Sequence, residues 1–163
     1  MTKITRPKGR VLGLDIGKKR IGSALSDELL ITTSPFRAFE VKSLNQTLKE
    51  IVTVCRDHKV GVLVVGVPFE LDGSEGEQTN YTVGVIKKLM TAFNPKALED
   101  SNLVLNTLMD NTDPAFYLLD ERYTSVQAEG LIKNKKLKNE ERRKEKDNMS
   151  ALILVETFIM NVS

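Results

Sequence analysis

The stretch VLGLDIGKKRIG, residues 11–22, joins a hydrophobic run to a single carboxylate and a group of cations. The run is too short for a helix and is typical of a strand buried on both faces of a parallel sheet. Asp15 stands at its end, and three basic residues, 18–20, follow directly after Gly17. In open α/β sheets, ligand sites form at the carboxyl ends of the parallel strands. The stretch therefore predicts the first strand of such a sheet and the first residue of a functional site.

Four further segments predict strands. VGVLVVGVP (60–68) and AFYLLDE (115–121) are apolar runs of the same kind as the first. IGSALSD (21–27) and ITTSPFRAFEV (31–41) are expected to form two strands that continue from the first as a hairpin or meander. The sequence therefore predicts five strands in a sheet that is partly parallel and partly antiparallel.

Apolar residues recur at helical spacing in four segments, 44–55, 74–93, 124–131 and 147–161. The first three open with Ser or Thr followed three residues later by Glu or Gln, which is the capping-box pattern of helix starts. Residues 94–114 fit no element and are expected to be an inserted excursion within a single domain spanning 1–163. The order of the elements predicts an α/β fold with a mixed five-stranded sheet flanked by helices.

The composition restricts the class of protein. A chain of 163 residues suits one domain with one hydrophobic core. Cys55 is the only cysteine, so neither a disulfide scaffold nor a zinc site is supported. No apolar stretch approaches the roughly 18 residues of a membrane span, and no signal peptide is recognisable. We therefore expect a cytoplasmic protein without a membrane partner, or an organellar one if a transit peptide has been removed.

The formal net charge of +2 is unevenly distributed. Residues 1–20 carry seven Lys or Arg and one Asp, and residues 133–146 carry eight Lys or Arg and three Glu. The rest of the chain therefore has a net charge of −9. Two basic segments on an acidic body suit contact with phosphate groups, although lysine-rich runs are also common as solvated surface. We expect the second segment to dock nucleic acid through Lys135, Lys136, Arg142 and Arg143.

Three acidic residues are expected to converge. Asp15 ends the first strand, Glu121 ends the last one, and Asp147 opens the final helix on the same face as Ala151 and Leu154. Asp147 either favourably charges the first turn of its helix or faces the core, where a lone charge is costly. Converging carboxylates repel unless their pKa values are shifted or a divalent cation neutralises them. Because all the ligands would be oxygens, the expected metal is Mg²⁺ or Mn²⁺.

Three other acids compete with Glu121 for this role. Glu70 and Asp72 closely follow the strand that ends at Pro68. Asp120 directly precedes Glu121, and adjacent strand residues point to opposite faces of a sheet. We favour Glu121 as the ligand and expect Asp120 to be a partner of that ligand.

Four motifs, in order and over nearly the whole chain, are similar to those of one family. They are LGLDIGKKRIGSALSD (12–27), VVGVPFELDGSEG (64–76), LLDERYTS (118–125) and DNMSALIL (147–154). Together they resemble the YqgF (RuvX) family of ribonuclease H-like proteins. Members of this family are described as Holliday junction resolvases and as nucleases that mature the precursor of the small-subunit ribosomal RNA.

The resemblance implies a ribonuclease H-like fold and Mg²⁺-dependent hydrolysis of phosphodiester bonds. It implies that the acidic metal ligands and catalytic residues are Asp15, Glu121 and Asp147. It also implies that the nucleic acid is held in part by Arg20, Arg122 and Thr124. Family members usually pass almost directly from the second helix to the strand that bears the LLDER motif, so residues 94–114 are an addition to the family pattern.

The residues and the resemblance together favour a two-metal mechanism. Two ions roughly 3.5 to 4 Å apart would activate water and stabilise the leaving oxygen. Gly17 would let the backbone turn close to a phosphate, and Lys18, Lys19 and Arg20 would attract the polyanion.

Other functions remain open at the level of sequence. An actin-like ATP-binding fold begins with a similar strand, but it needs two such domains and this chain supplies one. A non-catalytic nucleic-acid-binding or ribosome-assembly module is a further alternative. The substrate of a nuclease would be branched DNA or structured RNA, and a homodimer would suit symmetric cutting of a DNA junction.

Overall fold

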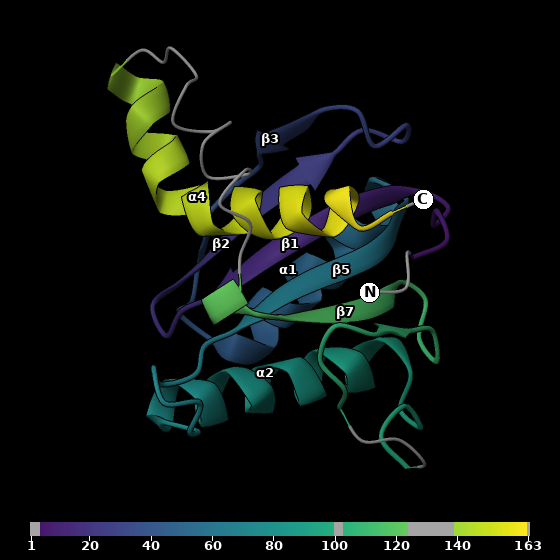
Figure 1. Cartoon of the computed structure of the whole chain (residues 1–163), viewed down its shortest axis with the longest axis vertical. Helices are drawn as coiled ribbons and strands as arrows, with labels where there is room; N and C mark the ends of the chain where they lie inside the picture. The colour runs from purple at the N-terminus through teal and green to yellow at the C-terminus, as the bar shows by residue number, and fades with distance from the viewer. Residues whose placement is uncertain (1–3, 100–102, 124–138, 163) are drawn as a thin grey trace.

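Among the residues that the structure describes, seven strands form one mixed sheet, with helices packed on both of its faces (Figure 1). The computed structural model describes residues 4–99, 103–123 and 139–162, and of residues 123 and 139–147 it describes the backbone alone. The strands follow the order β3-β2-β1-β5-β7-β6, and β4 also pairs with β2. A mixed sheet flanked by helices is the fold class that the sequence predicts.

The centre of the sheet consists of the three apolar runs of the sequence. They form β1 (Arg10–Ile16), β5 (Val60–Val67) and β7 (Ala115–Asp120), which pair in parallel. β2 (Arg20–Ser26) pairs antiparallel with β1. Because both faces of these strands are covered, nearly all of their residues are buried. The carboxyl ends of the three parallel strands therefore lie at one edge of the sheet.

The predicted number of five strands was wrong. Residues 31–41 form two short strands, β3 (Thr33–Pro35) and β4 (Phe39–Glu40), and both pair with β2. Between them the backbone N–H of Arg37 donates to the hydroxyl of Ser23 at 3.1 Å. A side chain of β2 thus takes the place of the backbone ladder and divides the expected strand in two.

Residues 94–114 extend the sheet at its other edge. They contain β6 (Leu108–Met109), which pairs antiparallel with β7, and a bridge between Leu105 and Leu118. Several apolar side chains of this segment pack against the core, namely those of Ala97, Leu98, Leu103, Leu105 and Met109. The sequence did not reveal β6, because two residues are too few to show an alternating pattern.

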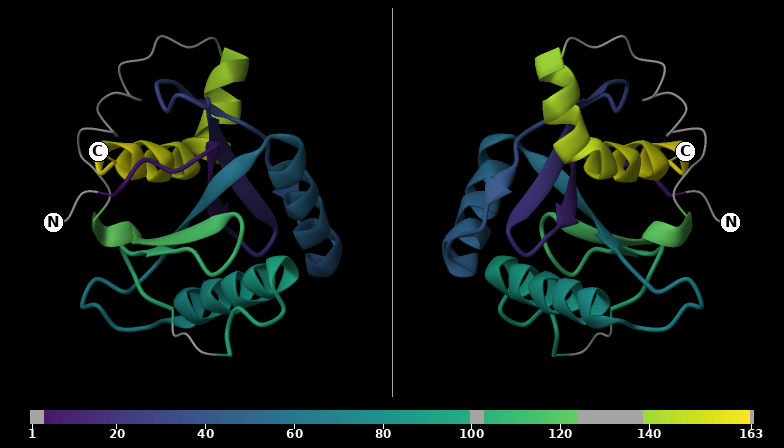
Figure 2. Two further views of the ribbon diagram at one scale, coloured as in Figure 1. Left: turned by 90° about the vertical axis from the view of Figure 1, so that its right-hand side faces the viewer. Right: turned by 90° about the vertical axis from the view of Figure 1, so that its left-hand side faces the viewer.

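In the described part of the chain, three α-helices cover the sheet. α1 (Leu44–Asp57) and α2 (Glu77–Phe93) lie on one face, and α4 (Asn139–Met160) crosses the other (Figure 2). α4 begins eight residues before its predicted start. The short helix predicted for 124–131 lies outside the described residues. No helix in the described part of the chain is long and apolar enough to cross a membrane.

The start of α2 differs from the capping pattern in the sequence. α1 is capped as predicted, since the hydroxyl of Ser43 accepts the backbone N–H of Gln46. In α2 the predicted cap, Ser74, belongs instead to a turn in which its carbonyl accepts the backbone N–H of Glu70 at 3.0 Å. The N-cap is therefore Gly76, whose N–H donates to the hydroxyl of Thr79 at 3.2 Å.

Alternate residues of the strands form two separate core layers. Leu14 and Val65 face α1 and α2, whereas Val64 and Tyr117 face α4. Gly13 lets α4 approach β1 closely: a Cβ atom there would lie 2.6 Å from Cγ2 of Val155 and 2.7 Å from the carbonyl oxygen of Ala151. The absence of a side chain at position 13 therefore determines how closely α4 rests on the sheet.

We expect Gly13→Ala to lower the free energy of unfolding by about 1 to 3 kcal/mol, because the added methyl group overpacks the α4 interface. Gly84→Ala is the matched control, since a Cβ atom at that exposed position in α2 meets nothing within 4 Å. The control should raise the free energy of unfolding by about 0.5 to 1 kcal/mol, because Ala favours the helix. Urea denaturation measures both. Equal effects of the two substitutions would contradict close packing at Gly13.

Candidate active site

The carboxyl groups of Asp15 and Glu121 meet at the carboxyl ends of the parallel strands. Asp15 is the penultimate residue of β1, and Glu121 opens the short 3₁₀ helix η1 (Glu121–Tyr123) directly after β7. Their side chains share a hydrogen bond. Two residues 106 positions apart in the sequence are thus in direct contact, as their positions at strand ends predict.

Gly66 of β5 makes room for this contact. Leu14 pairs with Val65, and Val67 pairs with Asp120, so Gly66 lies on the strand between the two acids. A Cβ atom at Gly66 would lie 2.4 Å from Oε1 and 2.8 Å from Cγ of Glu121. The Glu121 side chain therefore rests directly on the backbone of β5. An isolated glycine in a valine-rich strand is a sequence signal of such close approach.

The pKa values of both acids are raised. Burial raises the pKa of Asp15, and hydrogen bonds from Glu121 and Ser150 partly oppose this effect. The pKa of Glu121 rises to about 7, first through burial, then through the nearby charge of Asp15 and their hydrogen bond, and last through the charge of Asp120. The shared hydrogen bond lowers the pKa of Asp15 and raises that of Glu121, which fits a protonated Glu121 that donates to an ionised Asp15. The metal-free pair therefore holds one proton near neutral pH.

α4 contacts this pair from the second core layer. The hydroxyl of Ser150 donates to Asp15, and the buried Asn148 accepts the backbone N–H of Ser23 in β2 at 3.0 Å. Position 147 directly precedes Asn148 in α4. The side chain of Asp147, the third predicted ligand, lies outside the described residues. The sequence pattern did not identify Ser150 or Asn148, since a polar residue in a helix does not by itself indicate a partner.

The predicted nucleic-acid contacts are only partly described. Lys18 lies with its Nζ atom 5.8 Å from the ring centroid of Tyr81, and Lys19 and Arg20 are exposed at the turn between β1 and β2. These cations follow Asp15 and lie beside the same edge of the sheet. Outside the described residues are Thr124, Lys135 and Lys136, together with the side chains of Arg142 and Arg143.

The competing acids occupy other positions. Asp120 bonds to Arg122, whose hydrogen bonds lower the pKa of Asp120. Asp72 is exposed, and hydrogen bonds from the hydroxyl and from the backbone N–H of Ser74, the latter at 2.9 Å, lower the pKa of Asp72. No hydrogen bond or ion pair between described residues links Glu70 or Asp72 to the acidic pair. Glu121 is therefore the acid that meets Asp15.

The Asp15–Glu121 pair suits a hard divalent cation. The two partly buried carboxyl groups supply oxygen ligands, and a cation would neutralise their negative charge once the shared proton has left. Among the side chains that the structure describes, no group of three His, Cys, Asp or Glu could hold a metal ion. The described part of the site is thus a two-carboxylate arrangement, and Asp147 lies three residues before Ser150 in α4.

Comparison with known proteins relates the chain to nucleases. A family model described as RuvX, Holliday junction resolvase, matches residues 9–161. A relative from Roseiflexus sp. (strain RS-1) is 32% identical over 151 residues, which cover 93% of this chain and 94% of the relative. One from Sulfurihydrogenibium sp. (strain YO3AOP1) is 32% identical over 155 residues, covering 94% and 92%. Both are named "Putative pre-16S rRNA nuclease".

Solved structures with the same fold are resolvases. T. thermophilus RuvC in complex with a Holliday junction substrate matches with a TM-score of 0.53 and 12% identity, covering 91% of each chain. Fowlpox virus resolvase in complex with Holliday junction DNA matches with a TM-score of 0.50 and 12% identity, covering 93% of this chain and 97% of the resolvase. At this identity the likeness shows the fold, which is ribonuclease H-like as the sequence predicts.

The raised pKa values predict the pH dependence of stability. Glu121 holds its proton up to a pKa of about 7 in the folded protein, compared with 4.5 for an ordinary Glu. Between these values the folded state binds more protons than the unfolded state, so stability falls as pH rises. The contribution of Glu121 is complete below about pH 4.5 and is lost as pH rises through about 7.

Asp15→Asn should make this fall in stability shallower, because burial would still raise the pKa of Glu121 but the charge of Asp15 would no longer add to it. Urea denaturation in a chelator, across the same pH window, measures the slope. Asp110→Asn, at an exposed carboxylate in the loop before β7, is the control and should keep the slope of the unmodified protein. Equal slopes for all three proteins would exclude electrostatic coupling between Asp15 and Glu121.

Proposed function

Because the chain belongs to the RuvX family of Holliday junction resolvases, we propose that it is a divalent-metal-dependent endonuclease acting on structured nucleic acid. The observation that carries this proposal is the contact between the carboxyl groups of Asp15 and Glu121 at the ends of β1 and β7. The chain is accordingly a hydrolase of phosphodiester bonds.

In the proposed mechanism Asp15 and Glu121 would lose their shared proton to solvent and would hold Mg²⁺ or Mn²⁺, with Asp147 as the third ligand. When bound, the metal supplies activation of water and stabilisation of the charge that develops at phosphorus. Lys18 and Arg20 attract and orient the phosphate backbone from the β1–β2 turn. Thr124 and the basic segment 133–146 are further proposed contacts with the substrate.

We favour precursor ribosomal RNA as the substrate. The relatives that are 32% identical over more than nine-tenths of the chain are named as pre-16S rRNA nucleases. The second candidate is a four-way DNA junction, supported by the description of the matching family model. In that case a homodimer would provide two sites for symmetric cutting.

The experiment that tests this function is cleavage of matched labelled precursor RNA and junction DNA by the pure protein with Mg²⁺, Mn²⁺ or chelator. Cleavage of neither substrate would favour a non-catalytic ribosome-assembly module.

Asp15→Asn should abolish cleavage while the protein stays folded, because the amide keeps the shape of the side chain and removes an anionic ligand. Mg²⁺ should raise the Tm of the unmodified protein, since a ligand that binds the folded state stabilises it. The same ion should leave the Tm of the variant unchanged. Asp110→Asn should retain both cleavage and the Mg²⁺ effect. Metal-dependent cleavage by the Asp15→Asn protein would refute the role of Asp15.

The basic segment should contribute phosphate contacts. One variant replaces with Gln the four residues Lys135, Lys136, Arg142 and Arg143. A control of equal charge replaces four exposed cations of α1 and α2, namely Lys49, Arg56, Lys87 and Lys88. Each lost contact should reduce the slope of log affinity against log salt by about 0.9. We expect this reduction in the first variant alone, measured by fluorescence anisotropy in chelator. Equal losses in both variants would mean that only net charge matters.

A further inference from the structure

Asp120 and Arg122, the two neighbours of Glu121 in the sequence, form an ion pair across it. Nε of Arg122 lies 3.1 Å from Oδ1 of Asp120, and Nη2 lies 2.8 Å from Oδ2. The backbone N–H of Arg122 also donates to Oδ1 of Asp120 at 3.0 Å. The Asp120 side chain is 5% exposed and that of Arg122 is 27% exposed. We call this arrangement the Asp120–Arg122 brace.

The brace lies on the opposite face of the sheet from the acidic pair. Phe116 and Leu118 of β7 belong to the core layer under α1 and α2, and by strand alternation Asp120 continues their row. Tyr117 and Leu119 belong to the layer under α4, and Glu121 continues that second row. The brace therefore contacts the end of β7 on the face opposite to Asp15, and the carboxyl group of Glu121 lies on the same face as Asp15.

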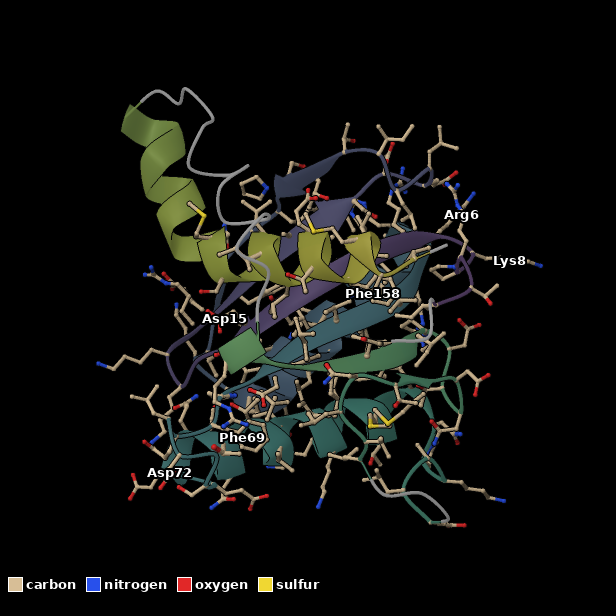
Figure 3. All side chains as sticks on the ribbon, in the orientation of Figure 1. Arg6, Lys8, Asp15, Phe69, Asp72 and Phe158 are labelled. Carbon is tan, nitrogen blue, oxygen red and sulfur yellow. The ribbon has the colours of Figure 1, made fainter. Side chains whose placement is uncertain are left out.

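Arg122 also holds the loop between β5 and α2, residues 68–76. Its guanidinium lies 5.4 Å from the ring centroid of Phe69. Figure 3 shows Phe69 on the side of the β7 end away from Asp15. Nη1 packs against Gly73, where a Cβ atom would lie 3.0 Å from it, and the φ angle of Gly73 is 88°. One side chain thus connects the end of β7 with the loop that follows β5.

We propose that Asp120 and Arg122 are positioning residues, which fix Glu121 against Asp15 and couple loop 68–76 to the site. The proposal rests on the proposed nuclease function, because it concerns the geometry of that site. This positioning role differs from a direct contact between Arg122 and a phosphate group of the substrate. The Nε and Nη2 edge that would grip a phosphate already bonds both oxygens of Asp120. Turning that edge to a substrate would leave a buried carboxylate unpaired, at a considerable cost.

The test compares Arg122→Lys, Asp120→Asn and the double variant. Hydrogen exchange in the metal-free protein should become about tenfold faster in loop 68–76 in each of them, because the loop loses its anchor. Nucleic-acid affinity in chelator, and its salt dependence, should not change. In cleavage assays kcat should fall by about 10- to 100-fold with little change in KM, which is the effect of a small misplacement of a catalytic group. The double variant should resemble the single ones, since the two residues act as a unit.

Arg37→Lys is the matched control. Arg37 bonds to Glu50 at 3.0 Å and lies 4.4 Å from the ring centroid of Phe39, so it combines an ion pair with a ring contact as Arg122 does. It lies at the β3–β4 edge of the sheet, away from the acidic pair. This variant should keep the exchange rates of loop 68–76, the affinity and the kcat of the unmodified protein.

Two results would overturn the proposal. Weaker binding in Arg122→Lys, with unchanged exchange in the loop, would make Arg122 a phosphate contact, because Lys cannot reproduce the bidentate hydrogen bonding of Arg. Unchanged exchange and unchanged kcat in Asp120→Asn would show that Asp120 positions nothing. If the unmodified protein cleaves neither RNA nor DNA, the proposed function fails, and exchange and binding still decide whether the brace anchors the loop. Because Arg122→Lys keeps the charge beside Asp120, it tests the brace even if Asp120→Asn does not fold.

Discussion

The contact between the carboxyl groups of Asp15 and Glu121 is the interaction on which the rest of the site depends. Both acids are partly buried, and the loss of hydration raises the pKa of each; the charge of Asp15 raises the pKa of Glu121 further. The fold brings them together through parallel pairing of β1, β5 and β7, which places the strand ends at one edge. The contact requires a glycine at position 66, because any side chain there would occupy the space of the Glu121 carboxyl group.

Strand alternation gives the end of β7 two different surfaces. Glu121 faces Asp15 and α4, whereas Asp120 faces Arg122 and the loop after β5. The same three residues therefore supply a carboxyl group that meets Asp15 on one face and a neutralised ion pair on the other. The acids differ in pKa for this reason: Arg122 lowers the pKa of Asp120, while burial and Asp15 raise that of Glu121. Identical chemical groups one residue apart acquire opposite electrostatic environments.

Sequence reasoning succeeded where a feature is local and strongly patterned. The apolar runs became β1, β5 and β7, and Asp15 and Glu121 were brought together because strand ends of a parallel sheet share an edge. It failed where tertiary contacts override local pattern. Ser74 has the sequence of a helix cap but is held by the Glu70 turn. β6 is too short to be seen, and nothing in the sequence around Arg122 distinguishes a brace from a phosphate contact. That difference arises from the position of Phe69, 53 residues earlier.

The acidic pair also links protonation, stability and the proposed metal chemistry. Without a cation, the shared proton is what allows two carboxyl groups to remain in contact near neutral pH. A proton and a divalent cation would therefore compete for the same oxygens, and binding of one would release the other. Packing around the pair prevents the two acidic side chains from moving apart. Gly66 lies beneath Glu121, Ser150 donates to Asp15, and the brace prevents η1 from turning. The repulsion is therefore kept in the folded protein, where only a positive charge can relieve it.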